Sequence, residues 1–172
     1  DGTYETVMKK AVQAFFSIEP TKSYREYFNV YIVKAVSKNE GFEAKNQTVF
    51  NSKWGKTSPA WGFDSNRSQC KNYALEVPHI NLQETPIIII VNTPRHAGGI
   101  TYLEESGEAL AFCARNKLDP DNIVGIVLHE GIGHALRRLA DEYTETSGHT
   151  SDDNPGQLLY WQQTYGWYLN VS

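Results

Sequence analysis

The chain has few of the residues and none of the patterns that mark several large classes of protein. It contains two cysteines among 172 residues, and they are not spaced as Cys-x-x-Cys, so a zinc site built from cysteines is not expected. Its longest apolar run, Pro86–Val91, is far shorter than the roughly 20 residues that cross a bilayer. A net charge of −4 argues against nucleic acid as a partner, because phosphate-binding faces are built from clustered Lys and Arg.

No signal peptide is visible, and the chain starts at Asp1 without an initiator methionine, so we expect a trimmed mature domain. Its length suits a single domain over residues 1–172. Hydrophobic residues make up 40% and charged residues 21%, which is ordinary for a globular protein. The sequence leaves two states open for Cys70 and Cys113, namely one disulfide or two buried thiols.

Hydrophobic spacing predicts both helices and strands in the first half of the chain. Apolar residues recur at helical spacing over Tyr4–Ile18, and a second, short helix is expected over 68–76. Segments rich in β-branched and aromatic residues are predicted strands: 28–36, 48–50 and 86–91. The last of these is apolar throughout, as expected for a strand in the middle of a sheet. Residues 53–68 should form a loop that Trp54 and Trp61 pin onto the core.

A β-hairpin is predicted after the glycine-containing segment 95–99. Its strands would be 100–103 and 108–113, and the turn would close near Gly107. A helix over 103–116 is the alternative. His96, in the glycine-containing segment, and His79, upstream, are expected to be polar loop residues.

A helix that carries two histidines and a glutamate is predicted from about Asn122 to Asp141. Its start is marked by Asp119-Pro-Asp-Asn122, with proline just inside the helix and acidic side chains at the positive end of its dipole. The apolar run 123–128 precedes His129, Glu130 and His134. Metal-dependent peptidases usually carry His-Glu-x-x-His on a helix, where the histidines bind zinc and the glutamate is the general base.

The two histidines are five residues apart instead of four. On a regular helix of about 3.6 residues per turn, residues four apart lie about 40° apart around the axis, and residues five apart lie roughly 140° apart. A π-bulge accommodates one extra residue and is frequent at functional sites. Gly131 and Gly133 flank the expected distortion, so we predict a widened helix that brings both imidazoles to one ion. The alternative is two histidines with no metal, on the surface or in the core.

A third metal ligand is expected from the residues that follow this helix. Asp141 is the candidate, because a carboxylate oxygen is an acceptable zinc ligand, and Glu142 and His149 are the alternatives. The downstream methionine turn of the metzincins is absent, because the only methionine is Met8. Tyr143 either steadies an oxyanion or anchors the site from below.

The stretch from Val127 to Tyr143 resembles the IgA-peptidase family of bacterial metallo-endopeptidases. That family carries a His-Glu helix followed by Gly-His and a Leu-Ala-Asp-Glu-Tyr ending. Two further segments resemble it: 20–32, with Phe28-Asn-Val-Tyr31, and 87–101, with Gly98-Gly99. The resemblance implies an α/β fold of the zincin type, a mixed sheet flanked by helices that include a zinc-binding active-site helix, and suggests a first strand upstream of Asp1.

The resemblance also implies one zinc ion, endopeptidase activity and a secreted, periplasmic or cell-surface location in bacteria, but no specificity for immunoglobulins. By position, His129, His134 and Asp141 would bind zinc, and Glu130 would be the base. A protein or peptide substrate could add as a strand along Gly98–Leu103, which includes Gly99, Ile100 and Tyr102. Ile100 and Tyr102 fit simple hairpin packing equally well. The rival functions are an inactive peptidase-like module that binds a host protein or glycan, and a domain in which zinc is structural.

Overall fold

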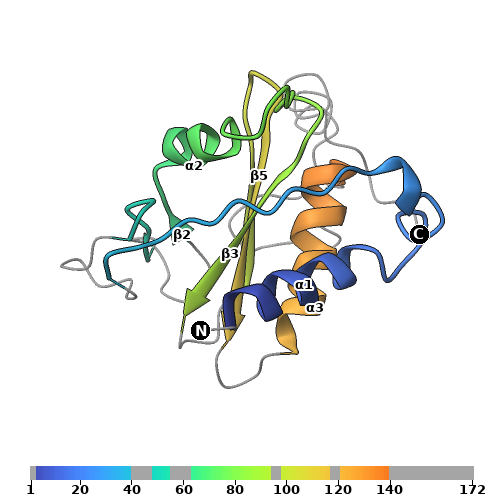
Figure 1. Cartoon of the computed structure of the whole chain (residues 1–172), viewed down its shortest axis with the longest axis horizontal. Coiled ribbons are helices and arrows are strands. Elements are labelled where there is room, and N and C mark those ends of the chain that lie inside the picture. Colours follow the sequence, from blue (N-terminus) through green and yellow to red (C-terminus); the bar gives the residue numbers. More distant parts are fainter. Residues whose placement is uncertain (1–2, 40–47, 55–62, 94–97, 117–120, 140–172) are drawn as a thin grey trace, which may run out of the picture.

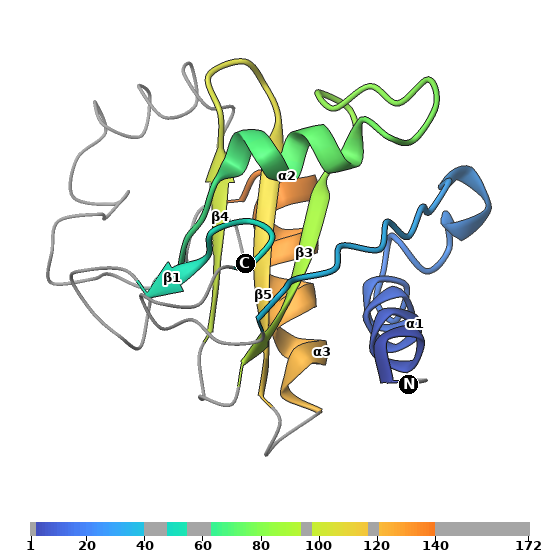
Figure 2. The same ribbon diagram turned by 60° about the vertical axis from the view of Figure 1, so that its left-hand side comes forward.

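A mixed sheet, with three strands among the described residues, forms the centre of the described structure. The computed structural model describes residues 3–39, 48–54, 63–93, 98–116 and 121–139. The strands are β3 (Ile87–Thr93), β4 (Gly99–Leu103) and β5 (Ala109–Asn116), in the order β3-β5-β4. Helix α2 (Arg67–Ala74) covers one face of the sheet, and a helical segment over residues 122–136 covers the other (Figure 1 and Figure 2).

Strand β5 is the most deeply buried element among the described residues. It pairs with β3 in parallel and with β4 in antiparallel orientation, and Leu110–Ala114 have no exposed surface. The prediction that 86–91 lies in the middle of the sheet is wrong for the described residues, because β3 is paired on one side only. The expected burial on both faces is also not met among the described residues, because Ile87–Ile90 are only partly buried. An apolar run favours burial, but strand order depends on which other segments pair with the strand.

The predicted hairpin is confirmed. Strands β4 and β5 pair with Gly99 opposite Cys113 and Leu103 opposite Ala109. The turn closes at Gly107, whose φ of 99° is a conformation that glycine adopts at low cost. The backbone N–H of Glu104 donates to the carbonyl of Glu108 over 2.9 Å. The alternative of a helix over 103–116 is excluded.

The two predicted N-terminal helices are present with slightly different bounds. Helix α1 spans Thr3–Phe15, three residues shorter at its end than predicted, and a single turn of 3₁₀-helix, η1, follows at Arg25–Tyr27. Helix α2 spans Arg67–Ala74. Its N-cap is Asn66, whose side chain accepts a hydrogen bond from the backbone N–H of Gln69 over 3.0 Å.

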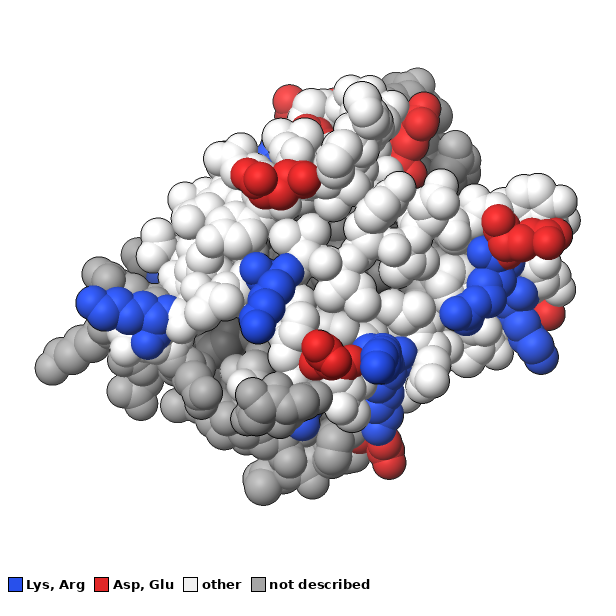
Figure 3. Space-filling view, in the orientation of Figure 1, with Lys and Arg blue, Asp and Glu red and all other residues white. Residues whose placement is uncertain are grey.

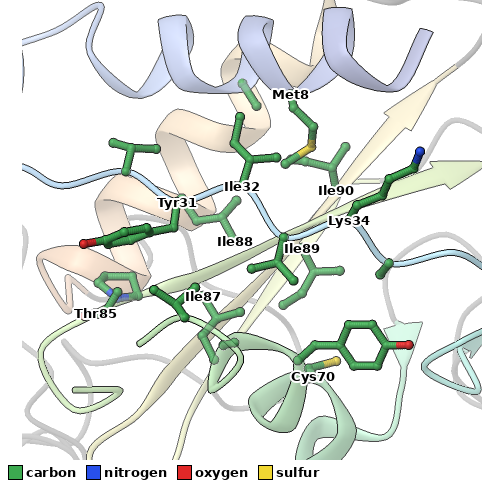
Figure 4. A pocket seen from close by; sticks show the side chains of 18 of the residues that line it. Met8, Tyr31, Ile32, Lys34, Cys70, Thr85, Ile87, Ile88, Ile89 and Ile90 are labelled. Atoms are coloured by element: carbon green, nitrogen blue, oxygen red, sulfur yellow. The ribbon is translucent and has the colours of Figure 1, made fainter. Parts of the chain in front are cut away.

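The segment 28–36 is extended but is not a strand, contrary to prediction. It crosses β3 in Figure 1, and both line a cavity of about 970 Å³ that Met8 and Cys70 also border (Figure 4). A strand requires ladder hydrogen bonds to a neighbour. Here the tyrosine hydroxyl of Tyr4 binds the carbonyl of Val33 over 2.9 Å, so the segment is fixed against α1. β-branched composition favours extended backbone but does not supply a partner.

Two further predictions for this half of the chain need correction. Residues 48–50 form a turn, not a strand. The expected loop 53–68 contains two short antiparallel strands, β1 (Lys53–Trp54) and β2 (Phe63–Asp64). Residues 55–62 lie outside the described residues. The anchoring of this loop by Trp54 and Trp61 therefore stays a prediction.

The described surface carries charges of both signs. On the face drawn in Figure 3, Lys and Arg side chains alternate with Asp and Glu, and neither sign dominates. No helix within the described ranges has the length and apolar character needed to cross a membrane.

Candidate active site

The helix that carries the histidines begins where the sequence predicts. Helix α3 spans Asn122–Ile126 and continues without interruption as a π-helix, η2, over Val127–Leu136. Ile123, Ile126 and Val127 are buried and pack in the core cluster with β5. The apolar run before His129 therefore packs the helix against the sheet, and this packing sets the position of the histidines relative to the sheet.

The predicted widening of the helix is confirmed and is longer than a single bulge. All ten residues of η2 are in π-helical conformation, and at its end the N–H of Arg137 donates to the carbonyl of Ile132, five residues earlier, over 3.0 Å. Hydrogen bonds that span five residues bring side chains five apart onto one side of the helix, as four-residue bonds do for side chains four apart. The insertion in the His-Glu motif is absorbed in this way.

Gly131 and Gly133 differ in their surroundings. A Cβ atom at Gly131 would lie 2.9 Å from Cδ1 of Ile88 on β3, whereas a Cβ atom at Gly133 would make only an ordinary contact of 3.7 Å with the carbonyl oxygen of Leu128. Close approach of the helix to the sheet therefore accounts for Gly131. The space around Gly133 does not require glycine.

The helix ends at Leu136, earlier than the predicted Asp141. Arg138 has a left-handed φ of 56°, and the N–H of Leu139 donates back to the carbonyl of Gly133 over 3.0 Å. A left-handed residue after the last turn, with a hydrogen bond back into the helix, is a common helix C-terminus at which the chain reverses direction. The reversal carries the carbonyl of Leu139 toward the histidines.

The two imidazoles meet. Nε2 of His129 lies 3.1 Å from Nε2 of His134, and their ring planes are inclined at 81°. His134 is buried, with 5% of its surface exposed, whereas 47% of the His129 side chain is exposed. The pair therefore has one ring fixed in the protein and one at the surface.

A backbone carbonyl sets the protonation of the His134 ring. Nδ1 of His134 lies 2.6 Å from the carbonyl oxygen of Leu139. A carbonyl only accepts hydrogen bonds, so Nδ1 carries the proton, and Nε2 keeps a lone pair when the ring is neutral. Histidines that bind metal ions almost always donate their other N–H to a carbonyl or carboxylate in this manner.

Glu130 lies buried between the helix and strand β4. Its side chain is 8% exposed, with Oε1 4.0 Å from Nε2 of His129. The hydroxyl of Thr101, on β4, lies 2.7 Å from Oε2 of Glu130. Thr101 was not among the functional residues predicted from the sequence. The strand alternation of 99, 101 and 103 was the available signal, but only the register against the helix shows which face meets Glu130.

Neighbouring residues on β4 face opposite sides of the sheet. Thr101 contacts Glu130 on the helix side, whereas Tyr102 packs on the α2 side, where the guanidinium of Arg67 lies 4.5 Å above its ring. Phe112 contacts the same ring edge-on, with centroids 5.9 Å apart. The side chain of Tyr102 is thus engaged in packing, one of the two roles left open by the sequence.

Both cysteines are free thiols, and both are buried, which decides against a disulfide. Burial raises the pKa of Cys113 well above its ordinary value, and the nearby carboxylate of Glu130 raises it further. Cys113 stands opposite Gly99 in the hairpin. Cys113 is therefore a neutral thiol, and it forms part of the apolar surroundings of Glu130.

Four candidate site residues lie outside the described residues: Asp141, Glu142, Tyr143 and His149. His96, which was expected to be a polar loop residue, also lies outside them. Within the described ranges, no group of three His, Cys, Asp or Glu side chains is placed to hold a metal ion. The structure therefore brings together His129, Glu130 and His134, and the third ligand stays a prediction. His79 lies in an exposed turn with a φ of 61°, in agreement with its expected place in a loop.

Two facing imidazoles beside a buried carboxylate on one helix are typical of metal-dependent hydrolases. Comparison with protein families agrees with this class and makes it specific. The chain belongs to the IgA Peptidase M64 family, whose family model matches residues 1–160. The resemblance inferred from the sequence is confirmed, and the protein is a peptidase of a metallopeptidase family. No curated protein and no solved structure matches the chain significantly.

Proposed function

We propose that this member of the family is a zinc-dependent endopeptidase in which His129 and His134 bind one zinc ion and Glu130 is the general base. The observation that carries the proposal is the 3.1 Å approach of the two Nε2 atoms, on a helix whose backbone hydrogen bonds span five residues instead of four. A location outside the cytoplasm of a bacterium, secreted, periplasmic or on the cell surface, is part of the proposal through the family resemblance.

The residues present fit a zinc ion. Two nitrogen ligands about 2.0–2.1 Å from one tetrahedral zinc ion lie roughly 3.3 Å apart, close to the 3.1 Å observed here. The bond from Nδ1 of His134 to Leu139 leaves Nε2 as the metal-binding atom. We propose Asp141 as the third ligand. The half-exposed ring of His129 favours a catalytic site, because catalytic zinc sites keep an open position and structural ones are closed.

Glu130 supplies the proton transfers in this proposal. When bound, zinc supplies a Lewis acid that polarises the scissile carbonyl and lowers the pKa of water. Glu130, with one carboxylate oxygen on the imidazole side, accepts the proton of the attacking water and delivers it to the nitrogen of the leaving amine. Tyr143 is proposed to lie under the metal site as an anchor.

The substrate is proposed to bind along β4 in extended form. Among the described residues β4 has a partner only on its β5 side, so its other edge can pair with the backbone of a peptide. Gly98, Gly99, Ile100 and Tyr102 would contribute backbone contacts. Gly98 has open space around its Cα, since an added Cβ would meet nothing within 4 Å, and a peptide can approach closely there.

Replacement of Glu130 by glutamine tests the proposal, because it keeps the shape of the side chain and removes the base. We expect digestion of labelled casein to fall by about 100- to 10,000-fold, while metal analysis still finds one zinc ion per chain. A chelator should abolish wild-type digestion, and added zinc should restore it. Equal activity of Glu130→Gln and wild type would overturn the proposal.

The same measurements separate the two rival functions. A binding module that has lost activity would hold zinc but digest nothing in the wild type. A structural zinc domain would unfold with chelator and be insensitive to Glu130→Gln.

A further inference from the structure

The inner face of strand β4 is shaped around the side chain of Glu130. A Cβ atom at Gly99 would lie 2.3 Å from Cγ of Glu130 and 2.8 Å from the carbonyl oxygen of Phe112. Both distances are far below van der Waals contact. Glu130 therefore occupies the space that any other residue at position 99 would fill.

The next inward-facing residue of β4 holds the carboxylate by a hydrogen bond. The hydroxyl of Thr101 lies 2.7 Å from Oε2 of Glu130 and 3.1 Å from the backbone oxygen of Glu130. A hydroxyl has one proton, and the shorter distance and the negative charge favour donation to Oε2. Oε1 then lies on the side of the imidazoles, 4.0 Å from Nε2 of His129.

We infer that Gly99 and Thr101 are positioning residues for the general base, and this inference rests on the proposed function of Glu130. Gly99 provides the space and Thr101 fixes the rotation of the carboxylate, so that one oxygen is anchored and the other is presented to the site. A general base must be held within hydrogen-bonding reach of the proton that it accepts. Loss of the anchor should therefore slow the chemical step and leave substrate binding unchanged.

The pair Thr101→Val and Thr101→Ser tests the hydroxyl. Valine keeps the shape and removes the hydroxyl, whereas serine keeps the hydroxyl. We expect Thr101→Val to lower kcat on labelled casein by about 10- to 100-fold, the range for a lost hydrogen bond to a charged group, with KM within about twofold of wild type. Thr101→Ser should restore most of kcat, and zinc content should be equal in all three proteins.

Thr85→Val is the matched control, because it makes the same chemical change in the lining of the cavity, to which Glu130 does not belong, and it should leave kcat unchanged. Wild-type kcat in Thr101→Val, or equal impairment of the valine and serine variants, overturns the inference. Should Thr101→Val fail to fold, Gly99→Ala decides: a folded Gly99→Ala protein with wild-type kcat overturns the inference, and a zinc-loaded one with reduced kcat supports it.

The proposed function and this inference fail in different ways. If Glu130→Gln is as active as wild type, Glu130 is not the general base, and both the proposed function and the positioning role are excluded. If Glu130→Gln is inactive and Thr101→Val is fully active, only the positioning role is excluded.

Discussion

At the scale of single residues, His129 and His134 differ in what holds them. His134 is buried and bound to the carbonyl of Leu139, so its ring is fixed before any metal binds. The side chain of His129 is half-exposed, and its ring contacts that of His134 at the protein surface. Removal of His129 therefore tests metal binding with little effect on the core, which removal of His134 would disturb.

We expect His129→Ala to bind zinc at least about tenfold more weakly than wild type, because loss of even an outer-shell partner of a metal ligand costs about 10- to 100-fold. Its melting temperature without metal should match that of the metal-free wild type. Competition with a fluorescent zinc chelator measures the affinity. His79→Asn is the control, since it removes an exposed imidazole and asparagine tolerates the positive φ at this position. Wild-type zinc affinity in His129→Ala would exclude His129 as a ligand.

At the scale of elements, the helix that carries the site is held by packing more than by its own propensity. Gly125, Gly131 and Gly133 lie within residues 122–136, and each glycine costs about 1 kcal/mol relative to alanine in a helix. Gly131 meets β3 closely, but Gly125 is exposed, and a Cβ atom there would meet nothing within 4 Å. The stability of the helix can therefore be raised at Gly125 without touching the site.

Gly125→Ala should raise the free energy of unfolding by about 0.5–1 kcal/mol and the melting temperature by about 2–4 °C, with activity unchanged. Thermal unfolding followed by circular dichroism measures this. Gly107→Ala is the matched control: the same substitution at a φ of 99° should lower the melting temperature, because alanine is strained there. A melting temperature of Gly125→Ala at or below that of wild type would contradict the expected gain.

The segment 28–36 and strand β3 show what element prediction misses. Both are rich in β-branched residues, yet only β3 joins the described sheet. Val30, Tyr31 and Ile32 are exposed, although their sequence is that of a strand. Local composition sets the backbone conformation, whereas pairing depends on a neighbour far away in the chain.

At the scale of the whole molecule, the two thiols report on the integrity of the core. Burial raises the pKa of Cys70 to about 12 and that of Cys113 well above its usual range. Both are then protonated thiols at neutral pH, and thiols react much more slowly than thiolates. Because both pKa values are raised in the folded state, the resulting stability is present below the unfolded pKa near 9 and is lost as pH rises above it.

We expect iodoacetamide to leave both thiols of the native protein unmodified at pH 8 and to modify both after unfolding in guanidinium chloride, as counted by mass spectrometry. The free energy of unfolding should fall as pH rises above about 9. Cys70→Ala serves as control, since its free energy of unfolding should fall less over that range. Rapid alkylation of the native protein at pH 8 would contradict the burial of these thiols.

Three features could be predicted from the amino-acid sequence alone: the helix that carries the site, the hairpin, and the distortion of that helix. These follow from local periodicity, turn residues and the five-residue spacing of His129 and His134, which are properties of neighbouring residues. The family also followed from the sequence, through the motif on that helix.

Three other features became known only from the folded structure. They are the position of β5 between β3 and β4, the free state of the cysteines, and the contact of Gly99 and Thr101 of β4 with Glu130. Thr101 and Glu130 are 29 residues apart in sequence. Their contact depends on the register of the hairpin and on where the helix docks on the sheet. Both are set by the packing of the whole core, and no local pattern in the sequence encodes them.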